Sequence, residues 1–432
     1  MKVLIAGSGA REHALAWAFA KGMSLPAAAS AGAAPGRDAL YCAPGNAGTE
    51  EVAKNVDIDP ENPKALVSAA RELGIDLVVV GPEGPLAAGA IDALGEAGIP
   101  AFGPPMKAAA LEASKAFARA FSERWGVPCA RTARFSDKAA LRRFVDESGG
   151  ARLVLKKSGL AAGKGVLESD DRAELLAFGE SVLESDELLA EEYLVGRELS
   201  IFALCDGKDY LVLPACADHK KAGRGDSGPN TGGMGAVCPV PYADAPTMAR
   251  IEREIVAPSF KGMEAEGLSY RGVLFLGVML TAEGPKLLEY NVRFGDPETQ
   301  SLLPLLETGV EDLAWKVATG SLASFKPRFS AKTACGVVVA APGYPGHYPK
   351  GLHVDLDGAG VVQGGDALLF HASTARGPDG RALTGGGRCF TAVGLGDCWE
   401  EARSRAYALA TEVRFEGAWF RPDIGERMHS GL

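Results

Sequence analysis

The stretch MKVLIAGSGAREHALAW (1–17) predicts a buried strand, a glycine turn and a helix, in that order. Val3–Gly7 is a short apolar run, and a helical segment follows at Arg11–Lys21. A second run of the same kind, DLVVV (76–80), leads into a GPEGP turn. Strands that are apolar throughout are typical of a parallel sheet covered by helices on both faces, which binds ligands at the carboxyl ends of its strands. The sequence therefore predicts a Rossmann-like α/β domain at residues 1–105.

The rest of the chain divides into two further regions, which fits an expectation of about 150 residues per domain. A helical stretch at Lys107–Trp125 begins the region 106–325, and a glycine-loop subdomain is expected inside it at about 127–195. The segment KPRFSAK (326–332) has the composition of a linker, and a small α+β domain is expected at 331–432. The predicted fold is therefore an α/β and α+β multidomain protein.

Composition argues against several classes of function. Lys and Arg number 45 against 55 Asp and Glu, and this net charge of −10 argues against a nucleic-acid partner. No apolar run approaches about 18 residues, and the apolar start is too short for a signal peptide, so no membrane or export segment is expected. The 8 cysteines contain no C-x-x-C pair, which favours free thiols in a reducing cytoplasm. Glycine is enriched, at 55 of 432 residues, and this predicts many loops close to a ligand.

The first glycine loop, GSGARE (7–12), is placed between the predicted strand and helix at the N-terminus. Two glycines at a helix N-terminus, with Arg11 beside them, suit a phosphate group. The third glycine of a dinucleotide fingerprint is replaced by Glu12, so a nicotinamide cofactor is only weakly supported. A tight strand-to-helix turn explains the same residues equally well.

The second glycine loop, GLAAGKG (159–165), joins two predicted strands. Its small residues allow backbone N–H groups to close over phosphate oxygens, and Lys164 adds positive charge. Lys156, at the end of the preceding strand, can reach the same phosphates. The loop is not a Walker A motif, because its spacing is short and Gly165 stands where Ser or Thr would ligate magnesium. A surface hairpin is the alternative.

The segment EYNVR (289–293) places Glu289, Asn291 and Arg293 on one face of a predicted strand, because side chains alternate along a strand. Two oxygen ligands at that spacing suit Mg²⁺, which takes few protein ligands together with substrate phosphates and water. Arg293 can hold a carboxylate or a transferring phosphoryl group. The alternative is a solvated polar face.

A long loop at residues 218–235 is rich in glycine, charge and hydrogen-bond donors. Loops longer than about 12–15 residues inside compact domains are usually either functional or disordered. The residue types alone do not decide between these two. The 6 histidines show no metal-ligand spacing, and no Ser-His-Asp arrangement is indicated.

Taken together, the motifs resemble those of the glycinamide ribonucleotide synthetase (phosphoribosylamine–glycine ligase) family of ATP-grasp enzymes, and the match covers essentially the whole chain. The segments that carry the resemblance are, in order, GSGAREHALAW (7–17), APGNAGTE (43–50), VVGPEGPL (79–86), SKAFAR (114–119), GLAAGKGV (159–166), EEYLVGRE (191–198), DHKK (218–221), GPNTGGMGA (228–236), EYNVRFGDPETQ (289–300), FHAST (370–374), TGGGR (384–388), RAYALA (405–410) and RPDIG (421–425). The segments GPNTGGMGA and RFGDPETQ are the most specific of these.

The resemblance implies a reaction and a fold. The fold is an N-terminal parallel-sheet domain, an ATP-grasp domain with a glycine-loop lid, and a small C-terminal domain. The reaction is ATP-dependent ligation of glycine to 5-phosphoribosylamine through glycyl phosphate, which gives glycinamide ribonucleotide, ADP and phosphate in purine biosynthesis. The cofactors are ATP and Mg²⁺, with Mn²⁺ as a substitute. The enzyme is expected to be a cytoplasmic monomer.

The resemblance also implies roles for individual residues. The implied catalytic residues are Lys164, Asp218 and Arg293. The implied ATP contacts are Lys115, Lys156, Gly163, Lys164, Gly165, the hinge Glu191, Glu192, Tyr193 and Leu194, and Glu198 for the ribose. The implied contacts of the two substrates are Gly9, Arg11, Glu12, Asn46, Gly81, Glu83, Asp218, Lys220, Asn230, Thr231, Gly232, Gly233, Met234, Gly235 and Arg293. The implied metal ligands are Glu289 and Asn291.

This chain departs from the family pattern at three places. Where the family usually has Lys-Ala-Asp-Gly, the chain has Lys156-Lys157-Ser158-Gly159. The segment between Val166 and Glu191 is shorter than usual, and the Ala/Gly-rich residues 26–36 have the character of a surface insertion. Two other functions stay open: an ATP-grasp ligase for a different acid or amine, and a non-catalytic nucleotide-binding homologue. The presence of Glu289, Asn291, Arg293 and Lys164 argues against the non-catalytic homologue.

Overall fold

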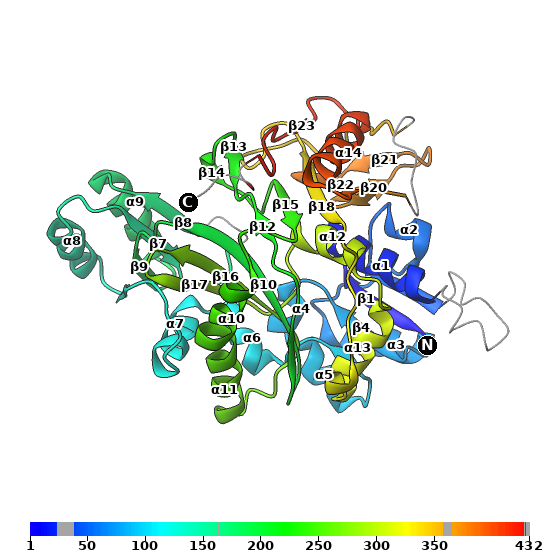
Figure 1. Cartoon of the computed structure of the whole chain (residues 1–432), viewed down its shortest axis with the longest axis horizontal. Coiled ribbons are helices and arrows are strands. Elements are labelled where there is room, and N and C mark those ends of the chain that lie inside the picture. Colours follow the sequence, from blue (N-terminus) through cyan, green and yellow to red (C-terminus); the bar gives the residue numbers. More distant parts are fainter. Residues whose placement is uncertain (24–38, 162–164, 357–364, 427, 429–432) are drawn as a thin grey trace.

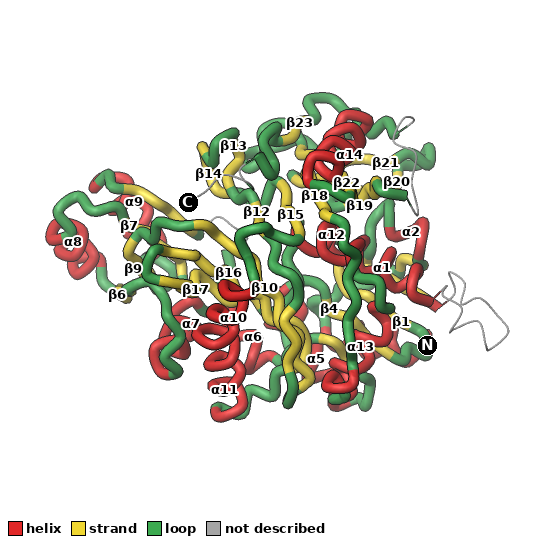
Figure 2. The backbone as a smooth tube through the Cα atoms, in the orientation of Figure 1, coloured by secondary structure: helices red, strands yellow, loops and turns green. Residues whose placement is uncertain are grey.

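The computed structural model describes residues 1–23, 39–161, 165–356, 365–426 and 428 (Figure 1). Gly163, Lys164 and the segment 26–36 therefore lie outside the described residues. Strands gather into larger sheets in the interior, and helices and loops cover them (Figure 2). No helix among the described residues is long and apolar enough to cross a membrane.

The N-terminal region folds around a parallel sheet with strand order β3-β2-β1-β4-β5. Its strands are β1 (Val3–Gly7), β2 (Leu40–Pro44), β3 (Lys54–Asn55), β4 (Leu77–Val80) and β5 (Ala101–Phe102). Its helices are α1 (Ala10–Met23), α2 (Thr49–Val52), α3 (Pro63–Leu73), α4 (Glu83–Ala87) and α5 (Ala90–Glu96). The strand order reverses between β1 and β4, so the loops that follow these two strands meet at the position where open α/β sheets bind ligands.

The helical stretch predicted at Lys107–Trp125 is two helices, α6 (Met106–Ala113) and α7 (Lys115–Arg124). Ser114 has extended backbone angles, and its hydroxyl accepts a hydrogen bond from the backbone N–H of Phe117 at 3.2 Å. A serine in this position caps a helix, so it ends one helix and begins the next. The break turns the N-terminus of α7 toward the strands that follow.

The central region is built on an antiparallel sheet with strand order β11-β10-β16-β17. These strands are β10 (Arg197–Asp206), β11 (Tyr210–Val212), β16 (Arg271–Thr281) and β17 (Gly284–Asn291). Helices α6 and α7, together with α10 (Ala245–Ile251), a π-helical turn (Glu252–Val256) and α11 (Ala257–Ala265), lie near it, and α13 (Val310–Thr319) packs on β10 and β16. The polar segment predicted at 289–293 begins on β17 and continues past its end.

A separate antiparallel sheet with order β6-β9-β7-β8 forms the subdomain that was expected as a glycine-loop lid, and it is called the lid below. Its elements are β6 (Thr132–Phe135), α8 (Lys138–Glu147), β7 (Leu153–Lys157), β8 (Val166–Ser169), α9 (Arg172–Val182) and β9 (Leu188–Glu192). The lid has a hydrophobic core of its own, which includes Leu141, Leu155 and Leu188. Figure 1 shows it projecting from the rest of the molecule.

The third large sheet combines strands from two distant parts of the chain, in the order β12-β15-β18-β22-β19, with β23 also paired to β18. From the middle of the chain come β12 (Ala217–Asp218) and β15 (Gly235–Cys238), and from the end come β18 (Thr333–Ala340), β19 (Ala367–His371), β22 (Arg388–Gly396) and β23 (Trp419–Phe420). Helix α14 (Trp399–Glu412) packs on β22 and β18. This sheet spans the division expected between residues 325 and 331.

The smaller elements complete the fold. They are the hairpins β13 (Lys221–Gly223) with β14 (Ser227–Asn230) and β20 (Thr374–Arg376) with β21 (Ala382–Thr384), the helix α12 (Glu298–Leu302), and two 3-10 turns (Leu303–Leu305 and Leu322–Ser324). The β13–β14 hairpin lies beside the β12–β15 end of the third sheet (Figure 1).

Four phenylalanines join the N-terminal sheet to the central sheet. Phe202 on β10 packs on Phe275 of β16 and on Phe294, with ring centroids 4.9 and 6.1 Å away, and Phe294 stacks on Phe102 of β5 at 6.0 Å. All four rings are buried. Because they bury a large apolar area at one point, they fix the two sheets relative to each other.

We expect Phe202→Ala to lower the free energy of unfolding by about 3–5 kcal/mol, because it removes a fully buried ring from a close-packed cluster. Urea denaturation measures the change. The exposed Met106, replaced by alanine, is the matched control and should shift stability by less than about 0.5 kcal/mol. A loss below about 1 kcal/mol for the Phe202 variant would contradict the importance of this cluster.

Candidate active site

A cleft of about 1230 Å³ lies where the lid, the central sheet and the third sheet meet. It is lined by side chains from all three and from the N-terminal region. The predicted site residues that line the cleft are Arg11, Glu83, Lys115, Lys156, Gly165, Glu191, Glu192, Tyr193, Leu194, Glu198, Asp218, Lys220, Asn230, Thr231, Gly232, Glu289, Asn291 and Arg293. The structure thus brings together residues that are far apart in the sequence.

A buried ion-pair network holds Lys156 at the cleft wall. Its ammonium lies 2.8 Å from Glu191, whose other carboxylate oxygen accepts a hydrogen bond from Arg119 at 2.5 Å. Burial favours a neutral carboxyl at Glu191, but the charges of Lys156 and Arg119 outweigh burial and lower its pKa. Lys156 and Arg119 also donate to the Leu288 carbonyl of β17, so the network joins the lid to the central sheet. It leaves one net positive charge beside the cleft.

Residues Glu191–Leu194 form the connection between the lid strand β9 and the central strand β10. The Glu192 carboxylate is 2.7 Å from Arg131 and 3.5 Å from Lys286, outside the cleft centre. Tyr193 is partly exposed, and the guanidinium of Arg152 stacks over its ring at 4.2 Å from the centroid. An exposed aromatic ring beside backbone of an inter-sheet connection suits a flat ligand such as a nucleobase.

Lys220 and Glu289 form the ionic centre of the cleft. The ammonium of Lys220 pairs with the carboxylate of Glu198 and lies 3.4 Å from that of Glu289. Burial favours the neutral form of Glu289, but Lys220, Lys156, Lys115 and Arg293 together lower its pKa to about 2. Glu289 is therefore ionised at every physiological pH.

Arg293 is held by side-chain oxygens of three residues and by the Phe294 carbonyl at 3.3 Å. Its guanidinium lies 2.8 Å from Glu112 on α6, 2.9 Å from the amide oxygen of Asn291 and 3.3 Å from Glu83 of the N-terminal region. These carboxylates overcome the effect of burial and raise the pKa of Arg293. Burial raises the pKa of Glu112, although Arg293 opposes that shift. Arg293 therefore joins the central sheet to the N-terminal loops and keeps a fixed charge at the cleft.

The donor set on β17 fits a divalent cation such as Mg²⁺. Glu289 supplies an ionised carboxylate, and Asn291, two residues on, supplies an amide oxygen, which accepts a hydrogen bond from Arg293 at 2.9 Å in this structure. The described residues contain no cluster of three or more His, Cys, Asp or Glu side chains arranged for a metal. A two-residue site of this kind matches Mg²⁺, which completes its coordination with phosphate oxygens and water.

Glu12 and Asn46 lie behind the cleft wall and shape the N-terminal loop. Glu12 is only 1% exposed, and its carboxylate accepts hydrogen bonds from the Gly9 N–H at 2.6 Å and from Arg11 at 2.5 Å. Asn46 donates to the Ser8 carbonyl at 2.9 Å. Gly81 packs so closely that a Cβ there would lie 2.1 Å from the Glu12 carboxylate. Arg11 and Glu83 are the residues of this group that reach the cleft.

The loop 218–235 is ordered around Lys220. The Thr231 hydroxyl and backbone N–H both donate to the Lys220 carbonyl, at 2.8 and 2.7 Å. Gly233 has a φ of +107°, and a Cβ there would lie 2.7 Å from Asp218, so this turn requires glycine. Burial and the neighbouring Glu298 raise the pKa of Asp218.

The remaining residues of this loop take different positions. Asn230, Thr231 and Gly232 line the cleft. Met234 and Gly235 are buried behind it, where Gly235 begins β15. The loop is therefore ordered, and part of it lines the cleft.

The Lys157-Ser158 pair, where the chain departs from the family pattern, has a structural explanation. The Ser158 hydroxyl accepts a hydrogen bond from the Ala116 N–H at 3.2 Å, and the Ser158 carbonyl accepts one from Lys115 at 2.9 Å. Lys157 points away toward Asp186, 3.8 Å from its ammonium. Ser158 thus fixes the start of α7 and the position of Lys115, whose ammonium donates to the Gly159 carbonyl at 3.3 Å.

Sequence reasoning missed three charged residues that support the site, namely Arg119, Glu112 and Arg388. Arg119 and Glu112 occur on the buried faces of α7 and α6, among alanines, leucine and phenylalanine. A charged residue on the buried face of a helix needs a buried partner. Helical periodicity alone could have shown that these two residues lie on that face. Arg388 on β22 donates to the Asp296 carbonyl at 2.8 Å, and its long sequence separation from that loop hid the contact.

Comparison with known proteins gives one consistent result along the chain. Residues 1–112 match the family described as phosphoribosylglycinamide synthetase, N domain, residues 113–299 match its ATP-grasp (A) domain, and residues 334–427 match its C domain. The phosphoribosylamine–glycine ligase of Rhodopirellula baltica is 41% identical over 439 residues, which cover 98% of this chain and 97% of that protein. The enzyme of that name from Rhizobium meliloti is 42% identical over 437 residues, covering 99% and 98%.

Solved structures support the same grouping. The crystal structure of phosphoribosylamine–glycine ligase from Thermotoga maritima superposes with a TM-score of 0.81 at 34% identity and covers 98% of this chain and 100% of that one. The biotin carboxylase domain of the Hydrogenobacter thermophilus 2-oxoglutarate carboxylase superposes with a TM-score of 0.68 at 17% identity, covers 100% of this chain and 99% of that one, and shows the fold alone. These matches confirm the predicted fold, with its N-terminal parallel sheet, ATP-grasp domain and small C-terminal domain.

The cleft lysines should differ in their readiness to lose a proton. Burial lowers the pKa of Lys115, whereas Glu198 and Glu289 overcome burial and raise the pKa of Lys220. As pH rises from 7 to 9 in the free protein, we expect acetic anhydride to label Lys115 before Lys220, with Glu289→Gln increasing labelling at Lys115. Mass spectrometry of the peptides, normalised to the exposed Lys138, measures this order. Earlier labelling of Lys220 would contradict the charge arrangement.

Proposed function

The chain belongs to the phosphoribosylglycinamide synthetase family, and on that premise we propose that it ligates glycine to 5-phosphoribosylamine in purine biosynthesis. The reaction consumes ATP and gives glycinamide ribonucleotide, ADP and phosphate. One observation carries the proposal: relatives that match across the whole chain share this activity in their names. The cleft agrees with it, because Glu289 is ionised there among four cationic side chains. Such a cleft suits the handling of several phosphate groups.

ATP binds, in this proposal, between the lid and the central sheet. The adenine lies against the connection Glu191–Leu194, and the ribose lies near Glu198. Lys115 and Lys156 neutralise the phosphates, assisted by the loop that contains Gly165 and by Gly163 and Lys164 outside the described residues. Because Glu191 is saturated by Lys156 and Arg119, its backbone rather than its carboxylate is the part available to the base.

Glu289 and Asn291 hold the divalent cation, Mg²⁺ with Mn²⁺ as a substitute. When bound, the cation neutralises charge on the phosphates as the phosphoryl group is transferred. The protein supplies one ionised carboxylate, from Glu289, and one amide, from Asn291, on a single strand. The negative charge of Glu289 also offsets the repulsion among the cleft lysines. Lys220, paired with both Glu198 and Glu289, contributes to that balance.

The chemistry proceeds in two steps. A carboxylate oxygen of glycine attacks the γ-phosphorus of ATP, so that the P–O bond to ADP breaks and glycyl phosphate forms. The amine of 5-phosphoribosylamine then attacks the glycyl carbonyl, the acyl C–O bond breaks, phosphate leaves and the amine loses a proton. Arg293, fixed by Glu112 and Glu83, stabilises negative charge in the first step. Neither step needs an enzyme nucleophile.

The two substrates occupy the side of the cleft formed by the N-terminal loops and the loop 218–235. Arg11, Glu83 and Asp218 reach the cleft directly. Gly9, Glu12, Asn46, Gly81, Gly233, Met234 and Gly235 shape these loops from behind. Because glycyl phosphate is readily hydrolysed, the lid must exclude water during turnover, and its separate core suits movement as a unit.

The cellular setting is part of the same proposal. All 8 cysteines are free, and 6 of them are buried, as in proteins of a reducing compartment. We therefore place the protein in the cytoplasm. As a separate part of the proposal, which follows from the family resemblance, it acts as a monomer on small molecules.

The decisive assay measures ADP release with ATP, Mg²⁺, glycine and freshly prepared 5-phosphoribosylamine, omitting each component in turn. We expect release only with all four present. Turnover that does not depend on glycine would identify an ATP-grasp ligase for a different acid. Complete absence of turnover in folded protein would identify a non-catalytic homologue.

Glu289→Gln should reduce kcat at least 100-fold and weaken the apparent affinity for Mg²⁺, because the neutral amide loses the charge that holds the cation. Steady-state kinetics over a range of Mg²⁺ concentrations measures both effects, with circular dichroism to confirm folding. Glu283→Gln is the matched control, since Glu283 is exposed and its carboxylate lies 3.0 Å from the ammonium of Lys286. Near-normal kcat in the Glu289 variant would remove this residue from the metal site.

A further inference from the structure

The hairpin β13–β14 lacks the usual means of holding a fixed shape. Its ten residues, KAGRGDSGPN (221–230), include three glycines and no buried apolar side chain. Asp226, at its tip, has a φ of 56°, a backbone conformation that is uncommon for any residue other than glycine. Contacts from outside the hairpin must therefore maintain its position.

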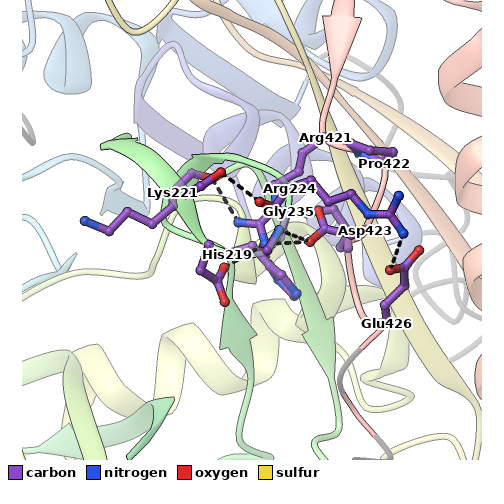
Figure 3. Close-up of polar contacts among 12 residues, drawn as sticks. His219, Lys221, Arg224, Gly235, Arg421, Pro422, Asp423 and Glu426 are labelled. Atoms are coloured by element: carbon purple, nitrogen blue, oxygen red, sulfur yellow. Dashed lines mark hydrogen bonds and ion pairs between the residues drawn. The ribbon is translucent and has the colours of Figure 1, made fainter. Parts of the chain in front are cut away.

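Those contacts come from the segment 421–425 near the chain end, the RPDIG motif to which the proposed reaction assigns no role. Figure 3 shows this segment beside the hairpin. The side chain of Arg421 is 1% exposed and donates to the Lys221 carbonyl at 2.9 Å, to Asp226 at 2.6 Å and to Asp423 at 2.6 Å. Burial lowers the pKa of Arg421, but the carboxylates of Asp423 and Asp226 outweigh burial and raise it.

Two further contacts join the segment 421–425 to the chain around the hairpin. Arg421, Asp423 and Gly425, together with His219, are called the clamp below. Asp423 accepts a hydrogen bond from the Gly225 N–H at 2.8 Å. His219 accepts one from the Gly425 N–H at 3.0 Å through Nε2, while its Nδ1 faces the Gly235 carbonyl at 3.3 Å. Burial and Arg421 lower the pKa of His219 to about 4, so the ring is neutral and Nε2 remains an acceptor.

The clamp is itself anchored on helix α14. The Tyr407 hydroxyl donates to the Arg421 carbonyl at 2.7 Å and accepts from the Ile424 N–H at 2.9 Å. Trp399 donates to the Gly425 carbonyl at 3.1 Å. Gly425 has a φ of +77°, and a Cβ there would lie 1.8 Å from the Trp399 ring, so only glycine fits. The segment 421–425 is therefore a rigid support.

The clamp grips the chain on both sides of Lys220. His219 precedes Lys220, and Lys221, whose carbonyl binds Arg421, follows it. The Lys220 ammonium is the group that pairs with Glu198 and Glu289 at the centre of the cleft. A shift of the hairpin would move this charge.

We propose that Arg421 is a positioning residue for the ligation reaction: with Asp423 and His219 it fixes the hairpin and so sets the position of Lys220 and of the loop that ends at Asn230 and Thr231. The inference rests on the proposed function for its kinetic consequence and on the geometry alone for its structural one. A planar guanidinium is needed because it reaches one carbonyl and two carboxylates at once, which a lysine ammonium cannot do with the same geometry.

The test compares Arg421→Lys, which keeps the charge, with Arg421→Met and with Asp226→Asn, which removes one negative charge at a half-exposed position but keeps an acceptor oxygen. Arg414→Met is the control, because Arg414 is an exposed arginine of the same region whose side chain pairs with Glu412. Measured quantities are kcat, KM for glycine and for 5-phosphoribosylamine, the ATP dissociation constant, the thermal midpoint, and hydrogen–deuterium exchange of the peptides that span 219–231.

For Arg421→Lys we expect kcat/KM for glycine or 5-phosphoribosylamine to fall at least tenfold and exchange in 219–231 to rise at least tenfold. ATP affinity should fall by less than kcat/KM does, since Lys115, Lys156 and the connection 191–194 lie on elements that the clamp does not touch and, of the proposed ATP contacts, Glu198 is the one that pairs with Lys220. Asp226→Asn should give a smaller loss in the same direction, and the control none. If Arg421→Met does not fold, the lysine and Asp226 variants still decide the question.

Two outcomes would overturn the inference. One is an unchanged kcat/KM and unchanged local exchange in folded Arg421→Lys. The other is exchange that rises equally throughout the protein, with ATP affinity falling in parallel, which indicates general destabilisation. If the unmodified protein shows no glycine-dependent ADP release, the proposed function fails, whereas the exchange of 219–231 still tests the clamp.

Discussion

The site depends on the balance between four cationic side chains and the carboxylates set among them. Lys115, Lys156, Lys220 and Arg293 point toward one cleft, and without opposite charges their repulsion would push them apart. Glu289 faces all four and is ionised at every physiological pH. Because these charges come from the lid, the central sheet and the loop 218–235, the same balance that prepares the cleft for phosphates also holds those parts together.

Apolar patterning predicted the fold well where a single strand has a clear apolar run of its own. Val3–Gly7 is a strand with the predicted bounds, and the run at 76–80 pairs beside it in a parallel sheet. The helical stretch predicted at Lys107–Trp125 is confirmed, but the break at Ser114 was not predicted, because periodicity does not register a serine cap between two helices. The domain boundary expected near residue 325 is crossed by one sheet, in which β15 pairs with β18. This pairing between residues 236 and 336 is a non-local contact that no local sequence pattern contains.

For the site, sequence reasoning identified residues that carry a visible motif and missed those that support them. Glu289, Asn291 and Arg293 were placed on one face by the period of a strand, and the structure brings them together with Lys220. Arg119 and Arg388 are supporting residues whose partners are distant in the chain, so their importance appears only after folding. Glu12 was expected among the substrate contacts, and the structure places it beneath the loop that Gly9 begins.

The C-terminal clamp affects the order in which this protein can be completed during synthesis. Lys220 is translated about two hundred residues before Arg421, and the hairpin that carries it has no apolar anchor of its own. The third sheet, likewise, is incomplete until β18 and β22 have been synthesised, because β12 and β15 pair with each other and β15 also pairs with β18. A nascent chain still on the ribosome can therefore hold a folded N-terminal sheet and lid while its cleft remains unfinished. In this architecture the cleft is complete only after Arg421 has been synthesised and has bound the hairpin.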